Sequence, residues 1–560
     1  MSAIPQRKSG RPQRALLVGF QDQDNLGLRY LSSAAHSAGH EPEIATYQAD
    51  PSALVQKVLA GRYDFVGLSL IFQYMTPSFA AAVTALREAG VKAHISMGGH
   101  YPSFAYKEVM SAAPGLDSIV RFEGEATLAS MLNAFSHGAE WRNTAGIAFR
   151  DQDGEIRATC LREPLADLDA LPWPDRQTID YGSHPLSTAS VLGSRGCPWD
   201  CSFCSIRPFY EAQGGQLRRL RRPDAVVDEM IDLHERRSVP VFLFQDDDFL
   251  ATGRRAREWA GRIADRLVDE GYAGDIAFKI SCRSDEIDEA AIRRLMAGGL
   301  THVYMGVESG DAASLATMNK KLGPQRHLRA GEILKSLGLS FDFGFMLMEP
   351  YSTFETIRNN IAFLDAFVGD GWSVAPFCRM LPYAGTPIRD RLASEGRLTG
   401  SESQPDYRFL DPKLDIFYEW MIETFYRRNF TAEGLCHLLR YRLFEARLRL
   451  RGRAAAPQHL AQLQYIAAVA NGVACQVLRS ALDHIERTPL DTLRRDREFL
   501  KALSAHEARE EEQLTHELRR YCAAIAAERR QRVSDSFDNS WTFEGLEREA
   551  PRNGGSLSAA

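Results

Sequence analysis

The feature that most constrains the fold is an alternation of short apolar segments with amphipathic ones, which occurs twice along the chain. The apolar segments are 15–20, 65–71, 93–98 and 118–121 in the first series, and 189–192, 241–244, 276–280, 303–307, 339–343 and 374–378 in the second. Short apolar runs of this kind are typical of buried strands, and strands that alternate with helices form parallel sheets. The sequence therefore predicts an α/β protein with two parallel sheets.

The two series divide the chain into predicted domains, and 560 residues suit three to four domains of roughly 150 residues each. The first series predicts a doubly wound, Rossmann-like domain, and the six strands of the second predict a partial (β/α)6 barrel, followed by an α-helical C-terminal region. Polar ends are expected to be disordered. The predicted boundaries are 1–13 disordered, 14–138 Rossmann-like domain, 139–186 linker, 187–400 barrel, 401–531 helical region and 532–560 disordered tail.

Composition excludes several classes of protein. The net charge of −6 does not suggest a nucleic-acid binder, and no apolar run reaches the roughly 18 residues of a membrane span. The polar N-terminus lacks the apolar core of a secretory signal. Nine cysteines are too few for a disulfide scaffold; none precedes Cys160, and three fall within eight residues. These features predict a cytoplasmic protein with one specialised metal site.

Cys197, Cys201 and Cys204 directly follow the first predicted barrel strand. Three thiolates at this spacing can surround one face of a cubane iron–sulfur cluster, and such clusters usually take four cysteines. No fourth cysteine lies nearby, so one iron stays open to chelate the amino and carboxylate groups of a small molecule. The alternatives are three core cysteines by chance or a zinc site, but neither His184 nor Cys160 has zinc spacing. The spacing favours the cluster, with the triad as metal ligands and catalytic residues.

This motif, with Phe203 before its last cysteine, resembles the radical SAM superfamily over about residues 187–391. Further matching positions are Gln245-Asp246-Asp247-Asp248, Ser281-Cys282-Arg283, Gly306-Val307-Glu308-Ser309, Met318-Asn319-Lys320 and Leu381-Pro-Tyr-Ala-Gly-Thr-Pro387. The resemblance implies that the open iron of a [4Fe–4S] cluster binds S-adenosylmethionine (SAM). It also implies that an electron then breaks the S–C5′ bond and leaves a 5′-deoxyadenosyl radical.

The same resemblance implies a set of SAM-binding residues, namely Phe203, Ser281, Arg283 and Glu308. Ser281 and Arg283 are expected to contact the SAM carboxylate, and Glu308 the ribose. Alternatively, Arg283–Asp285 and Glu308–Lys320 are simple ion pairs. Glu349 stands where the family usually has Gly-x-Pro, and it is expected to face the substrate.

The first domain resembles the cobalamin-binding domain that precedes many radical SAM barrels. The implied cobalamin-binding residues are Asp24, Asn25, Leu26, Gly27, Ser69, Gly98, Gly99, His100, Glu123, Gly124, Glu125 and Thr127. The alternative is a domain that binds another ligand or only supports the barrel. Methylthiotransferases, which also join an α/β domain to this barrel, are excluded because their first domain supplies cysteines for a second cluster, and this chain has none before residue 160.

One departure from the cobalamin pattern has chemical meaning. Classical members carry Asp-x-His-x-x-Gly, whose histidine is the lower ligand of cobalt, whereas this chain has Asp22-Gln-Asp24-Asn-Leu-Gly27. A carboxylate is a poor substitute for imidazole on cobalt. The resemblance therefore implies base-off cobalamin without a histidine ligand, unless His100 or another group supplies one.

These resemblances together imply a radical SAM C-methyltransferase of secondary metabolism. It is expected to methylate an unactivated carbon of a natural-product or peptide substrate, through a 5′-deoxyadenosyl radical and methylcobalamin. The expected partners are a small-molecule or peptide substrate and an external electron donor such as flavodoxin or ferredoxin, with no nucleic acid. Two alternatives stay open: a cyclase or rearrangement enzyme with the same cofactors, and a non-catalytic cobalamin or Fe–S binding regulator.

Overall fold

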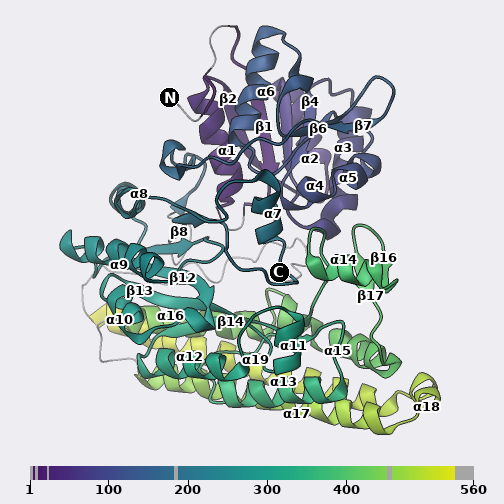
Figure 1. Ribbon diagram of the computed structural model, residues 1–560. Coiled ribbons are helices and arrows are strands. Elements are labelled where there is room, and N and C mark those ends of the chain that lie inside the picture. The colour runs from purple at the N-terminus through teal and green to yellow at the C-terminus, as the bar shows by residue number, and fades with distance from the viewer. Residues whose placement is uncertain are drawn as a thin grey trace.

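The computed structural model describes residues 4–6, 10–21, 24–181, 187–251, 253–450 and 457–535. The N-terminal domain, the barrel sheet and the C-terminal helices are stacked in this order from top to bottom in Figure 1. The sequence predicts that residues 1–13 are disordered. In the structure, however, Ile4 of this segment is buried, and the guanidinium of Arg11 pairs with Asp64 at 2.6 Å. Residues 536–560 of the predicted tail lie outside the described residues.

The N-terminal sheet has the order β2-β1-β3-β4-β5-β6-β7. Its parallel strands are β1 (Arg14–Gly19), β2 (Glu41–Thr46), β3 (Phe65–Ser69), β4 (His94–Gly98) and β5 (Ser118–Val120). Leu16 and Val18 pack on the side of α2 (Ser52–Gly61), α3 (Thr76–Glu88) and α5 (Tyr106–Ala112), whereas Ala15 and Leu17 face α1 (Leu26–Ser37) and α6 (Glu125–His137). This alternation follows from the two-residue period of a strand and confirms the doubly wound fold.

Two further strands, β6 (Ile147–Arg150) and β7 (Ile156–Ala158), extend this sheet in antiparallel pairing. They lie in the segment that the sequence predicts to be a linker. Their short, partly polar sequences do not form an apolar run, and the same is true of the edge strand β2, whose burial is partial. The sheet therefore extends to Ala158.

The second sheet is the partial barrel. Its six parallel strands follow the order β15-β14-β13-β12-β11-β8, with bounds β8 (Thr188–Val191), β11 (Val241–Phe244), β12 (Ala277–Arg283), β13 (Leu300–Glu308), β14 (Ser340–Met348) and β15 (Cys378–Arg379). β8 and β15 lie at opposite edges, so the barrel is open. The predicted last strand over 374–378 is reduced to the two residues of β15.

Helices cover the barrel sheet on its outer face. They are α8 (Pro223–Arg237), α9 (Arg254–Asp269), α10 (Glu289–Ala297), α12 (Pro324–Ser336) and α13 (Phe354–Val368). A single apolar core, which includes Phe242, Phe278 and Phe341, joins them to the strands.

The C-terminal region is helical, as predicted, and packs below the barrel (Figure 1). It contains α15 (Pro412–Phe430), α16 (Leu435–Leu450), α17 (Pro457–Arg487), α18 (Leu490–Arg495) and α19 (Glu498–Asp535). Within the described chain, one segment, Gln458–Arg487 of α17, is long and apolar enough by composition to cross a membrane. Its most apolar window is 56% buried, and α17 contacts α13, α16 and α19.

Candidate functional site

The three cysteines lie on one loop between the short strand β9 (Ser194–Arg195) and helix α7 (Ile206–Gln213). Gly196 opens the loop with a φ of +90°, and a Cβ there would lie 1.8 Å from the carbonyl oxygen of Leu217. Only glycine tolerates both conditions. The backbone at Gly196 therefore determines the direction in which the chain enters the cysteine loop.

Contacts from the segment after β13 hold the middle of this loop. The amide of Ser202 donates to the carbonyl of Met318 at 3.0 Å, and the side-chain amide of Asn319 donates to the carbonyl of Asp200 at 2.9 Å. The predicted Met318-Asn319-Lys320 motif thus positions the cysteine loop.

The thiols are partly buried. Burial raises the pKa of Cys197 and Cys201, and it raises the pKa of Cys204 to about 12. At Cys201, the positive charges of Lys320 and Arg283 oppose this rise in pKa. Free thiols here are protonated at neutral pH, so binding of a metal group must displace protons.

Arg283 lies beside the cysteine loop at the end of β12. Its guanidinium is 3.9 Å from the sulfur of Cys201 and stacks on Trp199 at 3.8 Å from the ring centroid. It also forms a two-point ion pair with Asp285, at 2.9 and 3.0 Å, and donates to the carbonyl of Lys320 at 2.7 Å. The ion pair considered as an alternative is therefore present, and Arg283 directly adjoins the cysteine triad.

Glu308 ends β13 in a left-handed conformation, with a φ of +68°. This conformation costs a non-glycine residue about 1–3 kcal/mol and is concentrated at functional sites. The Glu308 carboxylate is 3.6 Å from the ammonium of Lys320, which in turn lies 5.9 Å from the ring centroid of Phe203. Burial raises the pKa of Glu308, and Lys320 lowers it. The strained backbone brings this ion pair next to the cysteine loop.

A cavity of about 320 Å³ opens at the carboxyl edge of the N-terminal sheet. Predicted residues that line it are Leu26, Gly27, Ser69, Gly98, Gly99, Glu123, Gly124 and Glu125. At Gly99 the φ is +117° and a Cβ would lie 2.4 Å from the carbonyl oxygen of Leu70, so a side chain cannot be accommodated. Apolar side chains such as Leu17, Phe65 and Leu128 form its inner wall.

The barrel contributes the rest of this cavity wall, through Leu192, Arg195, Phe209, Tyr210, Gln245 and Asp247. Arg195 donates to Glu125 at 2.6 Å and to Glu123 at 3.2 Å. The carboxylates of the predicted Glu-Gly-Glu motif therefore bind an arginine that lies two residues before Cys197. The cavity of one domain and the cysteine loop of the other are thereby joined.

His100 makes a second contact across the domains. Its Nε2 is 2.6 Å from the hydroxyl of Ser205, next to Cys204, and its ring stacks on Phe209 with centroids 4.8 Å apart. Burial lowers the pKa of His100 to about 4, so the ring is neutral at physiological pH. His100 is not among the cavity-lining residues.

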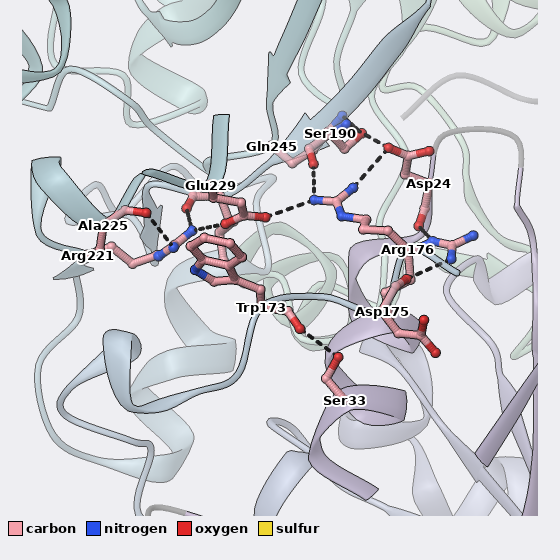
Figure 2. Close-up of polar contacts among 12 residues, drawn as sticks. Asp24, Ser33, Trp173, Asp175, Arg176, Ser190, Arg221, Ala225, Glu229 and Gln245 are labelled. Carbon is pink, nitrogen blue, oxygen red and sulfur yellow. Dashed lines mark hydrogen bonds and ion pairs between the residues drawn. The ribbon is translucent and has the colours of Figure 1, made fainter. Parts of the chain in front are cut away.

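Asp24 belongs to a buried charge network between the domains (Figure 2). Its carboxylate accepts a hydrogen bond from the amide of Ser190 at 2.7 Å and is 3.2 Å from the guanidinium of Arg176. Arg176 also donates to Glu229 at 3.0 Å, and Glu229 accepts from Arg221 at 2.6 Å. The Asp24 carboxylate thus binds the first barrel strand and the inter-domain segment.

Three other predicted residues have structural partners. The Asn25 side chain caps α1 by accepting from the amide of Leu28 at 3.2 Å. Thr127 is buried and donates to the carbonyl of Ala145 at 3.2 Å. Glu349 accepts from the amide of Tyr351 at 2.8 Å and is 2% exposed, so its carboxylate caps its own loop.

Comparison with known proteins identifies both halves of this site. A family model described as B12 binding domain matches residues 16–132, and one described as Radical SAM superfamily matches residues 191–364. The chain belongs to the cobalamin-dependent radical SAM enzymes. Enzymes of this family use an iron–sulfur cluster, SAM and cobalamin, and the cavity and the cysteine loop lie within the two matched regions.

Two curated relatives show how far the likeness extends. The chain is 27% identical to an uncharacterized methyltransferase of Pyrococcus horikoshii over 74% of this chain and 86% of the relative. It is 28% identical to the anaerobic magnesium-protoporphyrin IX monomethyl ester cyclase of Rubrivivax gelatinosus, over 54% of each protein, so it spans about half of that relative.

Among solved structures, the cobalamin-dependent radical SAM enzyme OxsB with aqua-cobalamin bound has a TM-score of 0.67. The match covers 92% of this chain and 81% of that one at 15% identity. At this identity the likeness establishes the fold.

The residues of this radical SAM enzyme suit the groups that the family uses. Three partly exposed thiols share one loop, as a cluster requires, and the cations Arg283 and Lys320 partly offset the rise in the pKa of Cys201 that burial causes. Glycines and apolar side chains line the cavity in the B12 binding domain, and they leave an apolar space that suits an aromatic ring. Within the described residues, no group of acidic, cysteine or histidine side chains is arranged to hold a single metal ion.

Three residues that shape the site were given no binding role from the sequence, although Asp247 belongs to a motif that matches the radical SAM family. Arg195 bridges to the Glu-Gly-Glu motif, Trp199 supports Arg283, and Asp247 lines the cavity and accepts from the amide of Gly196 at 2.8 Å. Two of them could have been found from their place in the sequence, because Arg195 lies two residues before Cys197 and Trp199 lies between Cys197 and Cys201. Asp247 follows the second barrel strand, where ligands of parallel sheets bind.

Proposed function

We propose that this enzyme methylates an unactivated carbon of a natural-product or peptide substrate, with SAM as the methyl source. The observation that supports this most is the cavity of about 320 Å³ whose walls come from both domains. Groups bound by the two domains would meet there without leaving the protein. When bound, the cluster with SAM supplies radical chemistry, and cobalamin supplies a methyl group.

The residues of the chain have separate tasks in this proposal. Cys197, Cys201 and Cys204 would hold the cluster, and Arg283, which stacks on Trp199 beside Cys201, would lie next to it. Phe203, Ser281, Arg283 and Glu308 are proposed to bind SAM. Ser281 faces the barrel interior together with Tyr304 of the neighbouring strand. Helix α16 of the C-terminal region packs against β13 and β14 of the barrel.

We further propose that cobalamin is bound base-off and without a histidine ligand. Both candidate ligands are already engaged, because Asp24 is paired with Arg176 and His100 is bound to Ser205. The apolar inner wall of the cavity offers a place for the detached aromatic base. An external flavodoxin or ferredoxin as electron donor and a cytoplasmic location complete the proposal.

The test uses protein reconstituted anaerobically with iron, sulfide and hydroxocobalamin. The reduced protein is incubated with SAM that carries a trideuterated methyl group. A small-molecule extract of the organism that encodes the protein is added as the source of substrate. We expect 5′-deoxyadenosine, S-adenosylhomocysteine and a product heavier by the labelled methyl group, all measured by mass spectrometry.

Two cysteine variants provide matched controls. Cys201→Ala should abolish 5′-deoxyadenosine while cobalamin absorbance is retained, and Cys160→Ala, at an exposed cysteine, should behave as the wild type. A product formed with 5′-deoxyadenosine but without S-adenosylhomocysteine would favour the cyclase or rearrangement alternative. Absence of 5′-deoxyadenosine from the wild type would contradict a catalytic role and favour a regulator.

A further inference from the structure

The inner face of the barrel sheet remains accessible to solvent. Along β12, β13 and β14, the residues that point outward are buried under helices, whereas alternate residues are partly exposed. The partly exposed positions are Lys279, Ser281, Tyr304, Gly306, Glu308, Asp342 and Gly344. Because successive residues of a strand face opposite sides, these positions define one continuous face that begins near the amino ends of the strands and ends at the cysteine loop.

Helix α16 closes the lower end of this face. Arg440, Phe444 and Arg447 lie on one side of the helix, at the spacing of one and two turns. Arg440 is 3.1 Å from the carboxylate of Asp342, and Phe444 packs edge-on against His302 at 5.2 Å. The floor of the barrel interior is therefore built by a helix outside the family-matched region, which ends at residue 364.

This floor carries more positive than negative charge. Lys279, Arg440 and Arg447 are its cations, and Asp342 is the carboxylate among them. Burial lowers the pKa of His302, so His302 adds no charge near neutral pH. Asp370, which also acts on Arg447, is already paired with Lys335 at 2.6 Å.

Asp342 is committed to partners other than Lys279. Besides Arg440, it accepts from the hydroxyl of Ser373 at 3.0 Å and lies 3.5 Å from His302. Arg447 donates to the carbonyl of Trp372 at 2.7 Å. Within the described chain, the Lys279 ammonium has no hydrogen bond or ion pair, and it lies 5.6 Å from the ring centroid of Tyr304.

Tyr304 completes this arrangement. In the described chain its hydroxyl has no hydrogen-bond partner, and it lies above Gly344, where a Cβ would be only 2.7 Å away. Glycine at this position leaves room beside the hydroxyl. A mostly buried ammonium and a phenol, both without partners and both facing the same space, form a pair of donors for an oxyanion.

The position of Lys279 relates this pair of donors to the cysteine loop. Lys279 and Arg283 are on the same face of β12, four residues apart, which corresponds to about 13 Å at roughly 3.3 Å per residue. Arg283 adjoins Cys201. A molecule held at Lys279 by one end would therefore extend along the open face toward the cysteine loop.

We propose that the barrel floor is an oxyanion subsite, in which Lys279 and Tyr304 bind a carboxylate or phosphate group of the substrate. The inference deepens the proposed function and rests on it, since it names the substrate as an organic acid or phosphate ester. The opposite end of this substrate, on the order of 10 Å away along the strand, carries the reacting carbon.

The test measures binding of ³²P-labelled inorganic phosphate and of ¹⁴C-labelled acetate to the reconstituted holoenzyme by equilibrium dialysis. The two probes distinguish a phosphate from a carboxylate subsite. We expect saturable binding of one of them at one site per chain, weakened at least tenfold by Lys279→Met and about threefold by Tyr304→Phe. Lys107→Met, at an exposed lysine on α5, should bind as the wild type does.

The inference is wrong if the wild type binds neither probe, or if both barrel variants bind as tightly as the wild type. Tyr304→Phe, which removes only a hydroxyl, decides the question should Lys279→Met fail to fold. If methyl transfer failed in the labelled-SAM experiment, anion binding at the barrel floor could still be measured, so the two proposals can fail separately. Conversely, an enzyme that transfers the methyl group but binds neither anion would overturn the subsite alone.

Discussion

At the scale of single residues, Asp24 occupies the position of the cobalt-binding histidine in the Asp-x-His-x-x-Gly motif, but it has a structural role instead. Its backbone has a φ of +62°, and its carboxylate is 13% exposed between the amide of Ser190 and the guanidinium of Arg176. A carboxylate that already accepts from two donors in a protein interior is poorly available to a metal, because release would leave both donors unpaired. Asp24 is thus a residue of the domain interface.

We predict that Asp24→Asn lowers the free energy of unfolding by about 1–3 kcal/mol, since it weakens a buried charge-assisted hydrogen bond. The EPR spectrum of the reduced, cobalamin-loaded protein should not change. Urea unfolding and EPR at low temperature measure the two effects. Asp153→Asn, at an exposed turn residue, is the control, and a changed cobalt spectrum in Asp24→Asn alone would contradict our assignment.

At the scale of elements, α19 is attached to α15 by a buried ion pair. Glu507 on α19 is 3.7 Å from Arg428 on α15, and both side chains are almost fully buried. Arg428 also donates to the carbonyl of Ala375 at 3.1 Å, just before β15. The last barrel strand is therefore linked through α15 to the final helix. Burial raises the pKa of Glu507 to about 7, Arg428 opposes this, and Glu511 and Glu510 add to it.

This shift in pKa predicts a pH-dependent effect of Glu507→Gln. The folded protein favours the protonated carboxyl, so the contribution of Glu507 to stability is full below its unfolded pKa of about 4.5 and is lost as the pH rises through 7. Wild type and variant should be similar near pH 4, and the variant should be more stable at pH 8 by on the order of 3 kcal/mol. Urea unfolding at both pH values measures this.

Glu512→Gln, at an exposed position of the same helix, should show no such pH dependence. If Glu507→Gln were less stable than the wild type at pH 8, the ion pair with Arg428 would outweigh burial.

At the scale of the whole molecule, several sets of contacts join the N-terminal domain to the barrel, and three of them lie near the site. They are the network around Arg176, the Arg195–Glu125 pair and the stack of His100 on Phe209. The shared cavity depends on these contacts, because its walls come from both domains.

We predict that Arg176→Met lowers the free energy of unfolding by about 3–5 kcal/mol, since it leaves the carboxylates of Asp24 and Glu229 with fewer partners in a buried site. Calorimetry should then resolve two unfolding transitions, where the wild type shows one. Arg157→Met, at an exposed arginine paired with Asp151, should unfold as the wild type does. A single unshifted transition in Arg176→Met would show that the network does not connect the domains.

The sequence alone was sufficient for features that depend on neighbours along the chain. Apolar runs predicted the main parallel strands, and the spacing of Cys197, Cys201 and Cys204 predicted one loop for a cluster. Gly98, Gly99 and Gly124 were found through the resemblance of their short local motifs to those of cobalamin-binding domains. The edge strands β2 and β7 were missed because edge strands are half-solvated and need no apolar run, and β6 was missed because its four residues are too short to be recognised within the segment interpreted as a linker.

Features that depend on distant partners were decided only by the tertiary structure. Asp24 meets Arg176 across 152 positions, and no local pattern encodes such a pairing. Likewise, the sequence shows Lys279 only as a lysine within a strand. Its lack of an ion pair becomes visible only in the structure, where Arg440 of α16 pairs with the nearby Asp342. Periodicity and spacing report how a segment is built, whereas the partner of a buried charge is set by which segments pack together. The sequence therefore determined the family and its cluster loop, and the packing of domains and C-terminal helices determined what surrounds them.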